Sequence, residues 1–225
     1  MANSNPEQLR FPTSAGFTIR ADFDGGAMSS DFGVLLASGV DRQTGLSDRV
    51  AASLTDTRHP SYIDHSMCDL VAQRLYQIAS GYCDGNDSNS LRVDPLLKLS
   101  IGRKPLDTKE DLASSPTFSR LENGASKKDL YLFAKALVEH FIDSYPKPPA
   151  SIVIDIDHSE DPTHGQQEFS FFNGHYGSYC YLPLFIFEGL SGKIITAVLR
   201  PGKTPTGAER NDLKTDFEIT SPTLA

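Results

Sequence analysis

Residues 151–161 read SIVIDIDHSED, and here the hydrophobic pattern of the chain changes from a helical period to strict alternation. Successive side chains of a strand point to opposite faces, so this run divides into an apolar face and a mixed face. The apolar face carries Ile152, Ile154 and Ile156, and the mixed face carries Val153, Asp155 and Asp157. The stretches before this run favour helices and those after it favour strands. The sequence therefore predicts a mixed α/β chain.

Composition limits the class of protein. The 225 residues carry 21 Lys and Arg against 29 Asp and Glu, a net charge of −8, and 39% of them are hydrophobic. A chain of this kind can bury a core and is not of the disordered class. Its apolar runs are too short to cross a bilayer, and its start, MANSNPEQLR, lacks the order of a signal peptide. We expect a globular, cytoplasmic protein with no membrane contact.

Helical signals dominate the first two thirds of the chain. Ser66 with Asp69, and Ser126 with Asp129, have the form of capping boxes ahead of amphipathic runs. The first run predicts a helix over 66–80, and the second predicts one that ends before Tyr145. We further expect a strand, a tight turn at Asp24-Gly25-Gly26 and a short helix within 17–39, a short helix over 91–103, and a helix from Ser115-Pro116 to Asn123-Gly124.

The prolines of Tyr145-Pro146-Lys147-Pro148-Pro149 cannot continue a helix and predict a stiff spacer. After it, Tyr179–Phe187 and Lys193–Leu199 read as two strands of an antiparallel hairpin, and the polar stretch 158–178 shows no strand pattern. The expected organisation is a flexible N-terminus (1–16), a mainly helical region (17–145), a proline-rich linker (146–150), a sheet-forming domain (151–203) and a tail (204–225).

Carboxylates gather where the strand of 152–157 ends. Asp155 and Asp157 share a face, and Glu160 and Asp161 follow directly. Mg²⁺ prefers carboxylate oxygens and keeps several waters, so one or two Asp side chains on a rigid strand suit it. The same spacing also fits a solvated acidic turn, and spacing alone does not separate the two interpretations.

Residues 98–128 carry seven basic and four acidic residues, a local charge of 7 − 4 = +3 in an acidic chain. Two predicted helices joined at Asn123-Gly124 in this patch could form a helix-turn-helix-like DNA reader. The residues that we expect to contact DNA are Lys98, Arg103, Lys104, Arg120, Lys127 and Lys128. A solvated helical hairpin is the alternative.

Six ordered blocks resemble the DDE transposases of bacterial insertion sequences, group 1. They are DFDGGAMSSDFGVLL (22–36), RHPSYIDHSMCDLVAQRLYQIASGYCDGND (58–87), LRVDPLLKLSIGR (91–103), LASSPTFSRLEN (112–123), DIDHSEDPTHGQQ (155–167) and YCYLPLFIFEGLSGKIITAVLRPG (179–202). Together they cover most of the chain from about residue 20 to 203.

The resemblance implies a ribonuclease H-like catalytic domain whose first strand carries the first Asp of an Asp-Asp-Glu triad. It assigns that role to Asp157, which Ser159 follows in the D-x-[ST] form of related transposases, with Asp155 as the alternative. It also implies Mg²⁺, or Mn²⁺, as the cofactor and the ends of an insertion sequence as the DNA partner. The implied reaction is metal-dependent DNA cleavage and strand transfer.

The chain departs from the family after Arg200-Pro201-Gly202, and beyond about Glu209 the resemblance ends. The later strands and the remaining triad carboxylates are not recognisable, so we expect an incomplete, C-terminally truncated ribonuclease H-like domain of three strands that is inactive alone. The alternative function is a catalytically dead fragment that binds DNA or full-length transposase and inhibits transposition. The protein partner that we expect is a second copy of the chain, as a homo-oligomer, or full-length transposase.

Overall fold

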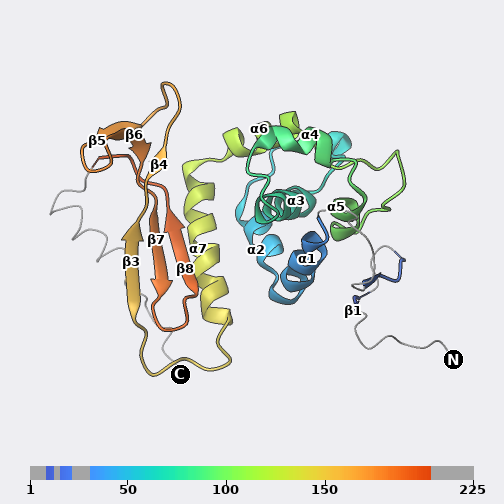
Figure 1. The fold of residues 1–225 in the computed structure, drawn as a ribbon, viewed down its shortest axis with the longest axis horizontal. Coiled ribbons are helices and arrows are strands. Elements are labelled where there is room, and N and C mark those ends of the chain that lie inside the picture. The colour runs from blue at the N-terminus through green and yellow to red at the C-terminus, as the bar shows by residue number, and fades with distance from the viewer. Residues whose placement is uncertain (1–8, 13–15, 22–30, 204–225) are drawn as a thin grey trace. The chain divides into compact units, whose positions relative to one another are not determined.

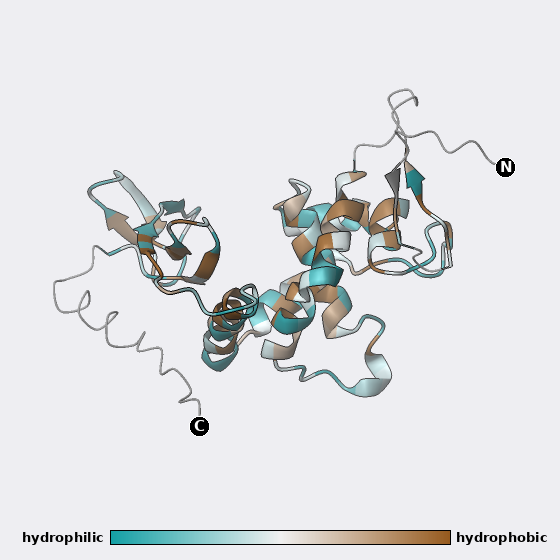
Figure 2. Ribbon diagram, turned by 90° about the horizontal axis from the view of Figure 1, so that it is seen from below, coloured by the Kyte–Doolittle hydropathy of each residue, from teal (hydrophilic) through white to brown (hydrophobic). Residues whose placement is uncertain are grey.

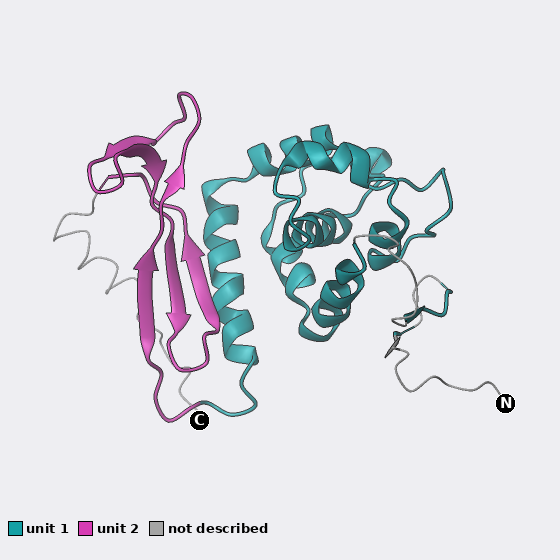
Figure 3. Cartoon of the chain, in the orientation of Figure 1, with its two compact units in different colours: residues 1–148 teal, residues 149–225 magenta. Residues whose placement is uncertain are grey.

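The computed structural model of the chain describes residues 9–12, 16–21 and 31–203. The chain divides into two compact units, residues 1–148 and residues 149–225 (Figure 3), and the division falls inside the proline-rich segment. Part of the expected flexible N-terminus is ordered as β1 (Leu9–Arg10), which pairs antiparallel with β2 (Arg20–Ala21). The expected turn at Asp24-Gly25-Gly26 and the tail 204–225 lie outside the described residues.

The first unit is helical (Figure 1). Its elements are α1 (Gly33–Thr44), α2 (Leu46–Ser53), η1 (Pro60–Tyr62), α3 (Met67–Ala79), η2 (Gly85–Asp87), α4 (Ser88–Leu91), α5 (Pro95–Ser100), α6 (Ser115–Gly124) and α7 (Lys127–Asp143). Among these helices of the described residues, none is long and apolar enough to cross a membrane.

Both predicted capping boxes are present. The Ser66 hydroxyl accepts from the Asp69 backbone N–H at 3.0 Å, and the Ser126 hydroxyl accepts from the Asp129 backbone N–H at 3.2 Å. In each box the Asp carboxylate accepts from the serine backbone N–H in return. These reciprocal bonds satisfy N–H groups that a helix start leaves unpaired, which is why α3 and α7 begin at the predicted residues.

Elsewhere the helix predictions needed correction. The short helix predicted over 91–103 is present but shorter, as α5, because Asp94 caps it by accepting from Leu97 N and Pro95 supplies its first residue. The one-turn helix α4, which ends at Leu91, was not predicted. Helix α6 begins at Ser115 and ends at Gly124 as predicted, with Ser114 at its N-cap position. Helix α2 was not predicted, and Gly45 separates it from α1 in a left-handed conformation with φ 68°.

Helix α3 is the centre of the unit because it contributes to three separate clusters of the core. Its Tyr76 packs with α1 and α5, its Val71 with α2, and its Leu70 with α6. Figure 2 shows the hydrophobic and hydrophilic residues alternating along these helices, as expected when each helix buries one face. Helix α7 joins the second cluster through Phe133.

The described residues of the second unit form two antiparallel three-stranded sheets. One has the order β3 (Ile154–His158), β7 (Leu184–Glu188), β8 (Ile194–Val198), and the other the order β4 (Asp161–Pro162), β6 (Ser178–Tyr181), β5 (Phe171–Asn173). The β7–β8 hairpin confirms the predicted antiparallel pair. With the helices of the first unit, these sheets establish the predicted mixed α/β fold.

Two details of the predicted sheet are wrong. Tyr179–Phe187 is not one strand: β6 ends at Tyr181 and β7 begins at Leu184, because Pro183 has no N–H to offer a ladder. The break lets the chain leave one sheet for the other. The polar stretch 158–178 also contains β4 and β5, which are too short for a period of two to be visible in the sequence.

A candidate catalytic strand and a basic helical surface

Asp155 and Asp157 lie on the same face of β3, two residues apart, as the alternation predicts. Strand β3 is an edge of its sheet (Figure 1), with Asp155 opposite Phe187 and Asp157 opposite Phe185. All five residues of β3 are exposed. The Asp157 carboxylate accepts from the His158 backbone N–H at 2.8 Å. Strand β3, which is hydrogen-bonded to β7, therefore presents two carboxylates to solvent on one face.

The acidic residues that follow β3 do not join this pair. Glu160 accepts from the hydroxyl of Ser178, and Asp161 lies in β4 of the other sheet, opposite Tyr181. Within the ranges that the structure describes, no group of three or more His, Cys, Asp or Glu side chains could hold a metal ion. The described part of the chain thus supplies two neighbouring oxygen donors on β3.

Glu188 is the buried carboxylate of this sheet and has a different role. It accepts from the backbone N–H groups of Ser191 at 2.7 Å, Leu190 at 3.2 Å and Val153 at 3.4 Å. The hydrogen bonds that it accepts from Ser191 have the largest effect in holding the pKa of this carboxyl below its usual value. Glu188 therefore ties the β7–β8 turn to the start of β3, and so helps to position the strand that carries Asp155 and Asp157.

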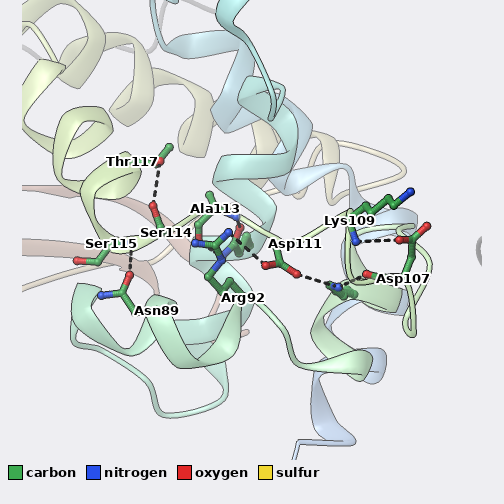
Figure 4. Close-up of polar contacts among 11 residues, drawn as sticks. Asn89, Arg92, Asp107, Lys109, Asp111, Ala113, Ser114, Ser115 and Thr117 are labelled. Carbon is green, nitrogen blue, oxygen red and sulfur yellow. Dashed lines mark hydrogen bonds and ion pairs between the residues drawn. The ribbon is translucent and has the colours of Figure 1, made fainter.

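Lys98 lies in the interior, only 2% exposed. Its ammonium group donates to the Asp107 backbone oxygen at 2.6 Å and lies 3.3 Å from the Asp111 carboxylate, which also pairs with Arg92 at 3.2 Å. Figure 4 shows Arg92 and Asp111 facing each other along the segment that leads to α6. This lysine anchors a loop and does not present its charge to solvent.

Arg103 is also engaged within the protein. Its guanidinium donates to the Asp69 carboxylate at 3.1 Å and to the Asp64 backbone oxygen at 3.2 Å, and it lies 3.1 Å from Nδ1 of His65. Burial, together with the positive charge of Arg103, lowers the pKa of His65. Arg103 thus joins the loop before α3 to the segment after α5.

The other four basic residues are exposed: Lys104, Arg120, Lys127 and Lys128. Lys127 and Lys128 are the first two residues of α7, where a positive charge opposes the helix dipole. The sequence analysis did not include two further exposed side chains of α7 among the expected DNA contacts. They are Tyr131, which is 70% exposed, and Lys135, whose side chain is 57% exposed. They follow Lys127 at i+4 and i+8, a spacing that places all three on one face. That spacing was the signal available in the sequence.

A groove of about 470 Å³ adjoins the α6–α7 turn, and we call it the α6–α7 groove. It lies between that turn, the loop after α2 and the start of α3; its lining includes Arg58, His59, Tyr62, Asp64, Leu70, Arg120, Leu121 and Asp129. The Asp129 carboxylate in its wall is saturated. It accepts from Thr55 and Ser126, and hydrogen bonds from these two residues lower the pKa of Asp129 to about 2.

A model of the transposase DDE domain, group 1, matches residues 11–215. The chain belongs to this DDE transposase family. The match confirms the resemblance and extends past Glu209, where we expected it to end. No curated protein and no solved structure matches the chain. Membership of this family implies a role in DNA transposition and binding to DNA, and the family typically uses divalent metal ions.

Proposed function

We propose that the reaction to which this chain belongs is the metal-dependent DNA cleavage and strand transfer of a DDE transposase, with Asp157 as the first triad carboxylate. That the chain is inactive alone stays a prediction, which the gel experiment below tests. The observation that supports the proposal is the pair of carboxylates on one exposed face of β3, inside the segment that matches the family. Asp155 shares that face and is the alternative. Asp157 is favoured because it stands at the end of the strand, ahead of Ser159.

The sheet supports a ribonuclease H-like assignment for the second unit. Strands β3, β7 and β8 are neighbours in the sheet in that order, each adjacent pair is antiparallel, and β3 lies at an edge. On its other side β3 pairs with no strand of the described residues, and its Ile154 and Ile156 are exposed. An open edge with apolar side chains is a place where a further strand adds. We propose that the catalytic sheet is completed there.

The donors fit the metal that the family implies. Carboxylate oxygens are the ligands that Mg²⁺ prefers, and Mn²⁺ accepts the same set. Asp155 and Asp157 would hold the ion from one side of β3, leaving positions for water, DNA oxygens or further carboxylates. A divalent ion there would activate a water or a 3′-hydroxyl for attack on a phosphodiester. The carboxylates would fix the ion to a rigid, hydrogen-bonded strand.

The exposed basic residues make α6 and the first half of α7 the proposed DNA-binding surface. Lys127, Lys128, Tyr131 and Lys135 lie along the exposed side of α7, and Arg120 lies on α6 just before it. Two helices joined by a short turn, with cations at the start of the second, suit a helix-turn-helix-like approach to a DNA groove. Lys104 adds a further exposed charge, whereas Lys98 and Arg103 support the surface from within.

A second candidate function is a binding protein that occupies DNA ends or full-length transposase and inhibits transposition. The observation that favours it is the number of carboxylates at β3. A triad needs three, and the residues that the structure describes bring only two together there. Removing members of a catalytic unit can abolish nearly all activity while binding persists.

One gel experiment separates the two functions. The purified chain is incubated with labelled DNA carrying the end of the element, with and without Mg²⁺ or Mn²⁺, and both binding and strand cleavage are scored. Metal-dependent nicking that Asp157→Ala abolishes and Asp161→Ala preserves supports the transposase. Binding without nicking supports the inhibitor, and nicking that survives Asp157→Ala overturns the residue assignment.

A further inference from the structure

The rim of the α6–α7 groove carries an aromatic side chain in an unusual setting. Tyr62 is 81% exposed, although tyrosine normally buries much of its ring. It is held by its local structure, since its backbone N–H donates to the His59 oxygen at 3.0 Å and closes η1. The His59 ring lies beside it, with 5.6 Å between ring centroids. The backbone of Tyr62 is thus held in η1, and its ring faces solvent at the groove beside the ring of His59.

The interior of the groove suits a flat ring. Leu70 and Leu121 belong to the cluster that packs α3 against α6, and both also line the groove. A volume of about 470 Å³ lies within the range of pockets that hold small ligands. An apolar floor under an aromatic rim is the arrangement by which proteins hold unstacked bases.

The charges of the groove leave one cation without an acidic partner. The Asp56 carboxylate accepts two hydrogen bonds of 2.7 Å from the Arg58 guanidinium. The Asp129 carboxylate accepts hydrogen bonds from Thr55 and Ser126. Arg120 donates only to the Thr117 hydroxyl of its own helix, at 3.3 Å, among the described residues. A guanidinium in this position is available for a phosphate.

The remaining carboxylate of the lining is that of Asp64, which is exposed. A carboxylate can accept from the amino group of a cytosine, adenine or guanine, so it is compatible with a base in the groove although it does not favour a phosphate. The apolar floor and the free cation therefore serve different parts of one ligand.

We propose that the α6–α7 groove holds an unpaired nucleobase of the DNA end, with its ring against Tyr62 and its phosphate at Arg120. The inference rests on the proposed DNA binding by α6 and α7, because their turn forms one wall of the groove. Duplex DNA lying along Lys127 and Lys128 would bring a separated strand to the mouth of the groove. An apolar peptide side chain could fill the floor, but it would leave Arg120 without a partner.

The test compares two labelled duplexes of the same sequence by fluorescence anisotropy, one fully paired and one with three unpaired terminal nucleotides. Stacking of one base on an aromatic side chain contributes about 1–3 kcal/mol, so we expect the wild-type chain to bind the unpaired end about tenfold more tightly. Tyr62→Ala should reduce this ratio to about one, and Tyr62→Phe should keep it. Tyr179→Ala, an exposed tyrosine of the second unit, is the matched control.

A wild-type ratio of one, or a tenfold ratio that survives Tyr62→Ala, overturns the nucleobase site while leaving the proposed DNA binding intact. Failure to bind either duplex contradicts the proposed function itself, and the nucleobase site with it. Because the readout is a ratio measured on one protein sample, a loss of folded protein cannot imitate the expected result.

Discussion

The side-chain amide of Gln73 is paired with the backbone of Ala113, forty positions away, through two hydrogen bonds of 2.9 Å. The Gln73 amide group donates to the Ala113 oxygen, and the Ala113 N–H donates to the Gln73 side-chain oxygen. Gln73 is 1% exposed and Ala113 is fully buried. This pair fastens the segment before α6 to the central helix α3, and so positions the proposed DNA-binding helices.

Gln73→Ala should destabilise the first unit by about 3 kcal/mol, since it leaves a buried N–H and a buried carbonyl unpaired and opens a cavity. Urea unfolding followed by circular dichroism measures the loss. Gln167→Ala, at an exposed position of the second unit, should change the free energy of unfolding by less than about 0.5 kcal/mol. Equal midpoints for Gln73→Ala and wild type would contradict the structural role of the pair.

The Asp129 carboxylate should make the first unit sensitive to acid. The pKa of this group is about 2 in the folded chain and about 3.9 in an unfolded one, so the folded state favours the ionised form. Its contribution to stability is complete above about pH 4 and is lost as the pH falls toward 2. Melting temperatures recorded from pH 6 to pH 2 should therefore fall more steeply for the wild-type chain than for Asp129→Asn.

Asp129→Asn should also melt lower than wild type at pH 6, because an amide cannot accept all four of the bonds from Thr55 and Ser126. Asp143→Asn alters an exposed carboxylate of the same helix that pairs with Arg49, and it is the control for the loss of a surface ion pair. Parallel pH curves for wild type and Asp129→Asn would refute the assignment.

Gly202 leaves no room for a side chain. A Cβ there would collide with the backbone oxygen of Cys180 and lie 2.8 Å from that of Phe171. Gly202→Ala should cost the second unit about 1–3 kcal/mol, the usual effect of overpacking. Gly174→Ala is the control, because its Cβ would meet nothing within 4 Å. Limited proteolysis should cut the second unit faster in Gly202→Ala only, and equal rates in both variants would be inconsistent with this packing.

Lys127 and Lys128 should set the salt dependence of DNA binding. Each phosphate contact changes the slope of log K against log salt by about −0.9, so the double change of both lysines to alanine should make the slope shallower by about 1.8. Titrations at several salt concentrations measure it. Lys147→Ala, an exposed lysine of the proline-rich segment, should leave the slope as it was. An unchanged slope in the double variant would remove these lysines from the DNA-binding surface.

Sequence patterns predicted those features that depend on neighbours within a few residues. The capping boxes at Ser66 and Ser126 need only the residue three positions on, and the shared face of Asp155 and Asp157 needs only the period of a strand. The strand break at Pro183 was equally local and could have been predicted from the missing N–H. The hydrophobic periods likewise separated a helical unit from a sheet-forming one.

Only the tertiary structure decided how similar residues differ in role. Lys98 and Lys127 look alike in a basic patch, yet Lys98 lies among Asp107 and Asp111 whereas Lys127 is exposed at the start of α7. The amphipathic period of α3 does not reveal that Gln73 holds Ala113, or that three segments enclose the α6–α7 groove. These outcomes depend on contacts between residues far apart in the chain, whose free energy is set by the packing of whole elements and not by local spacing.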